Sequence, residues 1–110
     1  MTRILFVCSP LRGKNFRERE NNRVRAWSYV NWLERRTGCK AIAPHTFLHH
    51  GLDDNDRRQR AMALRCCLGI LKDCDELHVF GWPLSPGMAE EVDAATFDFG
   101  IPVHYWSSRP

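Results

Sequence analysis

Short apolar runs of strand length alternate with longer segments of helical period, and this alternation is the feature that most constrains the fold. The run 3–8 is typical of a strand covered on both faces. Further strands are predicted at 40–43, 76–81 and 102–106. Helices are predicted at about 16–36 and 86–100, with another between them that ends at about residue 72. This order predicts an α/β fold: a small doubly wound parallel sheet of four strands, flavodoxin- or Rossmann-like, with order 2-1-3-4 and helices on both faces.

Composition narrows the class of protein. With 110 residues, 44% of them apolar and 26% charged, a single domain spanning residues 1–110 is expected. The apolar runs are much shorter than the ~20 residues of a membrane span, and no secretory pattern is present, so we expect a cytoplasmic protein without a membrane partner. Five cysteines without CxxC spacing indicate reduced thiols and no structural zinc. The net charge of +3 comes from arginines spread around two helices, which disfavours nucleic-acid binding.

Apolar spacing predicts which helix faces are buried. In the first helix Val24, Trp27, Val30 and Leu33 recur every three residues, and in the second the set is Ala61, Leu64, Leu68 and Leu71. A long polar loop is expected over 44–56.

Two loops follow strands one and three at the carboxyl edge of the predicted sheet, where open α/β sheets bind ligands. The first, Ser9 to Lys14, offers a hydroxyl, the Arg12 cation and a flexible glycine, Gly13, which suit an anion. The second ends at Ser85-Pro86, a helix start whose free N–H groups attract negative charge. The alternative for the first loop is a solvent-exposed turn.

Several motifs in this order resemble the nucleoside 2-deoxyribosyltransferase-like superfamily, and more closely its short bacterial and phage branch, which is related to nucleotide N-glycoside hydrolases. The matching segments are 4–13, 43–45, 52–56, 74–77, 80–81, 85–91 and 100–103. The resemblance implies that Glu91 is the glycosyl-accepting glutamate and that Pro10-Leu11-Arg12-Gly13 seats a 5′-phosphate. The chain departs from that pattern in three places: Cys67 stands where an aspartate is usual, Phe6 replaces a tyrosine, and Ser85 replaces an aspartate.

The departing base needs a proton donor, and the sequence leaves its identity open. The loop after the second strand lies on the correct edge, so His45 and Asp54, with Asp53 and Asp56, are candidates for acid or base work. Helix capping by the aspartates and loop hydrogen bonding by His45 are the structural alternatives. His45, His49 and His50 match no metal-site spacing, so neither a metal nor a cofactor is expected. Asp75 precedes the third strand and is assigned a structural role.

The sequence therefore predicts cleavage or exchange of the N-glycosidic bond of a nucleoside or nucleotide. Glu91 is the expected nucleophile, with His45 or Asp54 as acid or base, and the substrate-binding residues are Ser9, Pro10, Arg12, Gly13, Ser85, Gly87 and Met88. Glu90 is expected to be a neutral neighbour. The alternative is a non-catalytic nucleotide-binding module of the same fold. The aromatic content of the chain and the family resemblance together predict a homodimer or larger homo-oligomer.

Overall fold

A computed structural model describes residues 3–48 and 56–106 and contains one four-stranded parallel sheet. Its order, β2-β1-β3-β4, confirms the order predicted from the sequence. Phe6 lies opposite Ile42 of β2 on one side and opposite Leu77 of β3 on the other. The strands are β1 (Ile4–Cys8), β2 (Lys40–Ile42), β3 (Glu76–Phe80) and β4 (Val103–Trp106).

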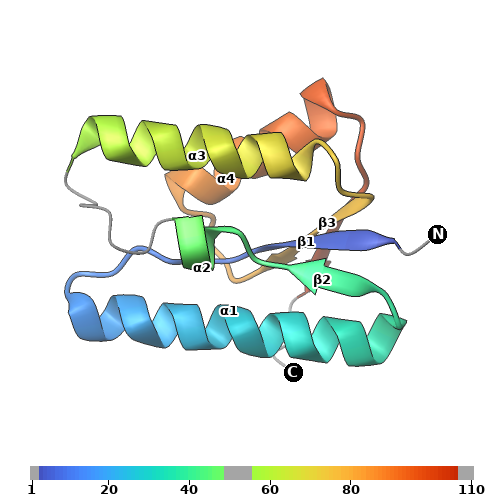
Figure 1. The fold of residues 1–110 in the computed structure, drawn as a ribbon, viewed down its shortest axis with the longest axis horizontal. Helices are drawn as coiled ribbons and strands as arrows, with labels where there is room; N and C mark the ends of the chain where they lie inside the picture. The colour runs from blue at the N-terminus through green and yellow to red at the C-terminus, as the bar shows by residue number, and fades with distance from the viewer. Residues whose placement is uncertain (1–2, 49–55, 107–110) are drawn as a thin grey trace.

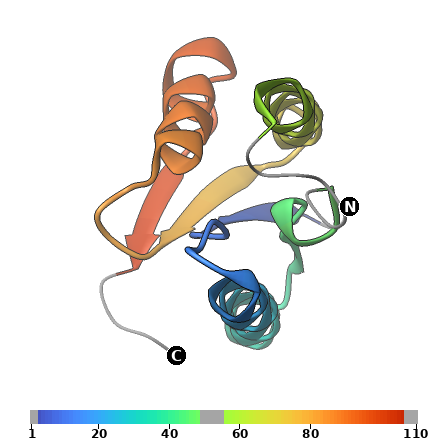
Figure 2. The same cartoon turned by 90° about the vertical axis from the view of Figure 1, so that its left-hand side faces the viewer.

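Helices cover both faces of the sheet (Figures 1 and 2). Helix α1 (Phe16–Thr37) lies on one face, and α3 (Arg57–Leu71) and α4 (Pro86–Asp93) lie on the other. A hydrophobic core lies on each face of the sheet, and alternate residues of β1 point into one or the other. Leu5 and Val7 lie in the core beneath α1, whereas Phe6 and Cys8 lie in the core beneath α3 and α4. Because both faces are buried, the strand reads as a continuous apolar run.

Helix α1 has the predicted bounds, but the predicted buried face is wrong. Ala26, Tyr29 and Leu33 are its buried residues, whereas Val24 and Trp27 are 54% and 52% exposed. A strict three-residue spacing winds around a helix, because each residue turns it by about 100°. Val24 and Leu33, nine residues apart, therefore lie on opposite sides, and only the i, i+3, i+7 set through Ala26 keeps one face.

The predicted loop over 44–56 is also partly wrong, since a short helix, α2 (His45–Leu48), follows β2 directly. Thr46 starts it, because its amide and its hydroxyl both donate to the carbonyl of Ala43, at 3.0 and 2.7 Å. Pro44 and His45 are buried as a result. The sequence reading took Pro44 as the start of irregular chain, whereas it stands immediately before a helical turn.

The other two helices differ from expectation in detail. Asp56 caps α3, and its carboxylate accepts from the amides of Arg58 and Gln59 at 2.8 and 3.3 Å, which lowers its pKa. The buried residues of α3 are Ala63, Cys67 and Leu71, so Ala61 and the half-buried Leu64 do not form the core face predicted for them. The predicted helix to Gly100 changes at Asp93 into a π-helical turn, η1 (Ala94–Asp98).

Among the described helices, none combines the length and apolar character needed to cross a membrane. All five cysteines are free thiols; Cys8, Cys67 and Cys74 are buried, Cys39 is half-buried and Cys66 is exposed. Asp75 accepts from the backbone amide of Ile4 at 2.7 Å, which fits the structural role assigned to it.

Replacing Asn15 with Ala is expected to lower the free energy of unfolding by about 1 kcal/mol. The Asn15 side chain caps α1 by accepting from the amide of Glu18 at 2.9 Å, and Ala leaves that amide without its cap. Chemical denaturation measures the change. Asn31→Ala is the matched control, because Asn31 is exposed within the same helix and its loss should change stability little. Equal effects from both variants would contradict the cap.

Candidate active site

A cavity of about 350 Å³ opens where β1 and β3 reach the carboxyl edge of the sheet. Its walls come from the turn after β1, the start of α2, the first half of α3 and the start of α4. The strand order reverses between β1 and β3, the place where open α/β sheets form ligand crevices. Its volume lies at the small end of the range for ligand sites.

The cavity brings together most of the residues selected from the sequence. Seven of them line it: Ser9, Arg12, His45, Ser85, Gly87, Met88 and Glu91. Pro10 and Gly13 are not among its lining residues, and Asp54 lies outside the described residues. The chemical roles assigned to these side chains remain predictions.

Pro10 and Gly13 shape the turn after β1. At Gly81, which follows β3 and has φ +103°, an added Cβ would lie 3.1 Å from Pro10 Cδ, so the two loops pack closely. At Gly13 an added Cβ would lie 2.6 Å from Glu18 Cβ, which is closer than two carbons can approach. These glycines thus allow close contact of backbone with neighbouring elements.

Asn22 of α1 holds the same turn and was missed by sequence reasoning. Its side-chain amide donates to the carbonyls of Leu11 and Arg12, each at 3.2 Å. The polar face of an amphipathic helix gives no sign that one residue turns toward a loop. Through Asn22, α1 fixes the backbone that carries the Arg12 guanidinium.

Glu91 is buried on the cavity wall with 6% of its surface exposed. Burial raises its pKa to about 7, and the neighbouring Cys8 thiol offsets this slightly as a hydrogen-bond donor. Ser85 begins α4 by accepting from the amide of Met88 at 3.3 Å, which sets the position of Glu91 in the second turn. Glu90, its neighbour, is exposed at the same cavity.

Two buried thiols lie near the Glu91 carboxyl. Burial, followed by the charge of Glu91, raises the pKa of Cys8 well above its usual value. The same two causes, with a smaller one from Cys66, raise the pKa of Cys67 to about 12. Cys67 therefore keeps its proton at neutral pH and is a poor general acid.

His45 enters the cavity from the start of α2, where it is 5% exposed. Its Nε2 lies 3.1 Å from the hydroxyl oxygen of Ser9, which is also buried. The residue that follows β1 and the residue that follows β2 are thus joined by a hydrogen bond at the cavity. This contact helps to fix the orientation of the imidazole ring at the cavity.

Three arginines line the cavity from two elements: Arg12 from the turn after β1, and Arg57 and Arg60 from the first turn of α3. Sequence reasoning counted the two α3 arginines as part of a dispersed surface charge. Their spacing of three residues places them on one face of the helix, but the spacing alone does not say that this face lines a cavity. The cavity lining therefore combines permanent positive charge with the buried Glu91.

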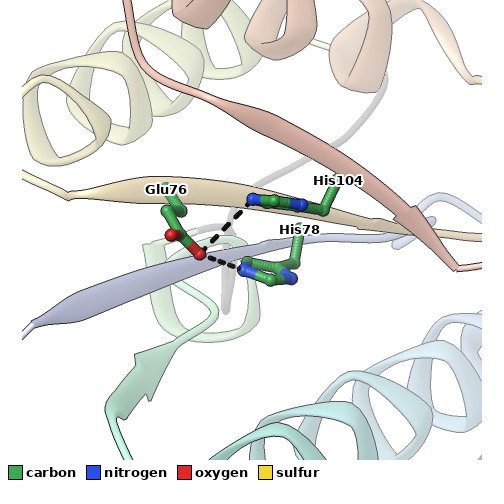
Figure 3. Close-up of side chains that lie close together, drawn as sticks. All are labelled: Glu76, His78 and His104. Carbon is green, nitrogen blue, oxygen red and sulfur yellow. Dashed lines mark hydrogen bonds and ion pairs between the residues drawn. The ribbon is translucent and has the colours of Figure 1, made fainter. Parts of the chain in front are cut away.

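Outside the cavity, Glu76, His78 and His104 form a cluster on the α1 side of β3 and β4 (Figure 3). Sequence reasoning missed it as well. The i, i+2 spacing of Glu76 and His78 puts them on one face of a strand, but their approach to His104 depends on the pairing of β3 with β4.

Comparisons with known proteins give a family and a similar fold, and leave the activity open. A family profile described as "Domain of unknown function (DUF7768)" matches residues 3–106. A solved 2-deoxyribosyltransferase from Bacillus psychrosaccharolyticus superimposes with a TM-score of 0.61 at 18% identity, over 93% of this chain and 70% of that one. No curated protein matches the sequence. At this identity the structural likeness shows a shared fold.

Proposed function

The chain belongs to the family described as a domain of unknown function, DUF7768, and from its cavity we propose that it cleaves or exchanges the N-glycosidic bond of a nucleoside or nucleotide. The observation that carries this proposal is the buried carboxyl of Glu91 on the wall of a cavity that also presents three arginines. The similar fold of a 2-deoxyribosyltransferase supports the same class of substrate.

In the proposed reaction a carboxylate oxygen of Glu91 attacks C1′ of the sugar. The bond from C1′ to the base nitrogen breaks, its electron pair leaves with the base, and a glycosyl ester forms on Glu91. Water or a second base then attacks C1′ and releases the carboxylate. Because only the ionised carboxyl is a nucleophile, and burial raises its pKa to about 7, kcat/KM should rise with pH up to about 7 and then level off.

The base leaves readily only when it is protonated, and His45 is the described residue that best suits this step. Its ring lies at the cavity and Ser9 orients it through the 3.1 Å contact. The high pKa of Cys67 argues against a thiol in this role. Asp54, the other candidate from the sequence, lies outside the described residues.

The arginines favour a nucleotide over a nucleoside, because guanidinium groups bind phosphate through paired hydrogen bonds. Arg12→Ala is expected to raise KM for a nucleoside 5′-monophosphate by about 10- to 100-fold, as charge-assisted hydrogen bonds are lost. KM for the matching nucleoside should hardly change. Steady-state kinetics on both substrates test this, with Arg65→Ala as the control on the same protein, since Arg65 is exposed and does not line the cavity. Equal changes for both substrates would contradict a phosphate site at Arg12.

The second candidate function is a nucleotide-binding module without chemistry. It is favoured by Cys67, which stands beside Glu91 in place of an acidic partner. Incubation with a panel of nucleosides and nucleotides separates the two, with chromatography to detect free base. Base release supports the enzyme; saturable binding without release over the whole panel supports the module.

Self-association remains a prediction from the sequence. Large apolar side chains that are exposed in the single chain support it, among them Trp82 at 77% and Phe16 at 69%. Light scattering over a range of protein concentrations measures the oligomeric state.

A further inference from the structure

Three potential metal ligands converge at the start of β3, on the face of the sheet that α1 covers (Figure 3). Glu76 and His78 are two residues apart on β3, and His104 is the direct partner of His78 on β4. None of the three lines the cavity, which opens at the other ends of these strands.

The ligand atoms of this cluster are close to one another. Glu76 Oε1 lies 2.9 Å from His78 Nε2 and 3.5 Å from His104 Nε2, and all three atoms lie within 4.8 Å of one another. The two imidazole rings stack with their centroids 4.7 Å apart and their planes 20° from parallel. Both Nε2 atoms therefore face the same carboxylate oxygen from neighbouring strands.

We propose that Glu76, His78 and His104 bind one divalent transition-metal ion of the zinc class, with water completing its coordination. Two imidazole nitrogens and one carboxylate oxygen form a set that Zn²⁺ accepts with a fourth position open to water. The site is reached from solvent through His104, whose side chain is 48% exposed. Two rigid paired strands hold all three ligands.

The surroundings of Glu76 suit this role. Arg3 pairs with Oε2 of Glu76, which leaves Oε1 directed at the two imidazoles. Ligating carboxylates are commonly fixed by such an outer partner on the second oxygen.

Binding has one defined cost at His78. The indole N–H of Trp106 donates to His78 Nδ1 at 2.9 Å, so without metal the imidazole proton sits on Nε2 and is donated to Glu76. Coordination through Nε2 moves that proton to Nδ1, and the Trp106 indole must turn to another acceptor. Two hydrogen bonds, from Trp106 to His78 and from His78 to Glu76, are exchanged for metal–ligand bonds, and Trp106 becomes a reporter of occupancy.

The test uses the untagged full chain carrying Cys66→Ser, because the exposed Cys66 thiol is an accessible zinc ligand outside the cluster. Isothermal titration with ZnCl₂ at pH 7.5 should show one ion per chain. His104→Ala should weaken that binding at least about 100-fold, since a ligand is lost outright. Tyr105→Ala is the matched control: it changes the adjacent exposed residue of β4, and the affinity should stay the same.

A second measurement removes the ambiguity of a misfolded variant. The indole N–H resonance of Trp106 in ¹H–¹⁵N NMR spectra should shift on addition of Zn²⁺ and stay in place in His104→Gln, which keeps a polar side chain there. Circular dichroism checks that each variant is folded. The proposal is overturned if the Cys66→Ser protein binds no stoichiometric zinc, or if His104→Ala and His104→Gln bind it as tightly as their parent does.

Discussion

Glu91→Gln is expected to reduce base release by at least about 10³-fold, with little change in affinity for the nucleotide. An amide oxygen is a far weaker nucleophile than a carboxylate, while its size and its place on the cavity wall are the same. Release of base from the substrate identified by the panel provides the rate, and titration calorimetry provides the affinity.

The same substitution has an expected effect on stability, with a definite sign. Burial raises the Glu91 pKa to about 7 from an unfolded value near 4.5. The folded state therefore binds the proton more tightly, so the contribution of Glu91 to the free energy of unfolding is greatest below pH 4.5 and falls as pH rises to about 7. Glu91→Gln removes this fall and should be more stable than wild type above pH 7, by up to about 3 kcal/mol.

Glu90→Gln is the matched control for both measurements. Glu90 lines the same cavity but is exposed, so neither the rate nor the pH dependence of stability should change much. Unfolding of Glu91→Gln at all pH values would indicate a structural carboxylate. Equal mild losses of rate in both variants would instead indicate two surface charges without a role in chemistry.

Phe80→Ala should lower the free energy of unfolding by about 3–5 kcal/mol, the usual cost of removing a buried aromatic ring. Phe80 is 2% exposed and stacks on Tyr29 of α1, with centroids 4.4 Å apart and planes 7° from parallel. The rings of Trp32 and Trp106 pack around the same ring, with their centroids 6.1 and 6.3 Å from its centroid. Phe80 thereby joins α1 to the β3–β4 half of the sheet. Urea denaturation should show a lower midpoint at an unchanged slope.

Phe97→Ala serves as the control for this core substitution. Its ring is 81% exposed, so its loss should change stability by less than about 0.5 kcal/mol. A similar cost at both positions would contradict the assignment of Phe80 to a packed core.

The topology could be predicted because the short continuous apolar runs of buried strands and the longer period of helices leave distinct patterns. The buried face of α1 could not, because tryptophan and valine are apolar whether or not they are covered. Ala26, a small residue between Arg25 and Trp27, is fully buried but gives little hydrophobic signal. Helix α2 was not predicted because its start depends on one residue: the amide and hydroxyl of Thr46 both donate to the carbonyl of Ala43.

Much of the cavity was predictable, since parallel strands bring the loops that follow them to one edge. Ser9, Arg12 and Ser85 were selected on that ground and all line it. Asn22, which holds the turn after β1, and Arg57, which lines the cavity, were not selected. Both lie on helices, and the rotation of a helix about its axis decides which of its polar residues face the site. Such rotation depends on packing against residues far away in sequence.

The amino and carboxyl edges of the sheet differ in what their side chains contact. Substitutions at the two edges should therefore affect different properties, stability at one and ligand binding at the other. At the amino edge, Asp75 accepts from the Ile4 amide and Arg3 pairs with Glu76, so neighbouring strands are joined by side chains. At the carboxyl edge, side chains surround an open cavity. In a saturation mutagenesis library sorted separately for abundance and for ligand binding, the positions that affect each property should therefore lie at different edges of the sheet. Variants of Asp75 would lose abundance, and variants of Arg12 would lose binding while remaining abundant.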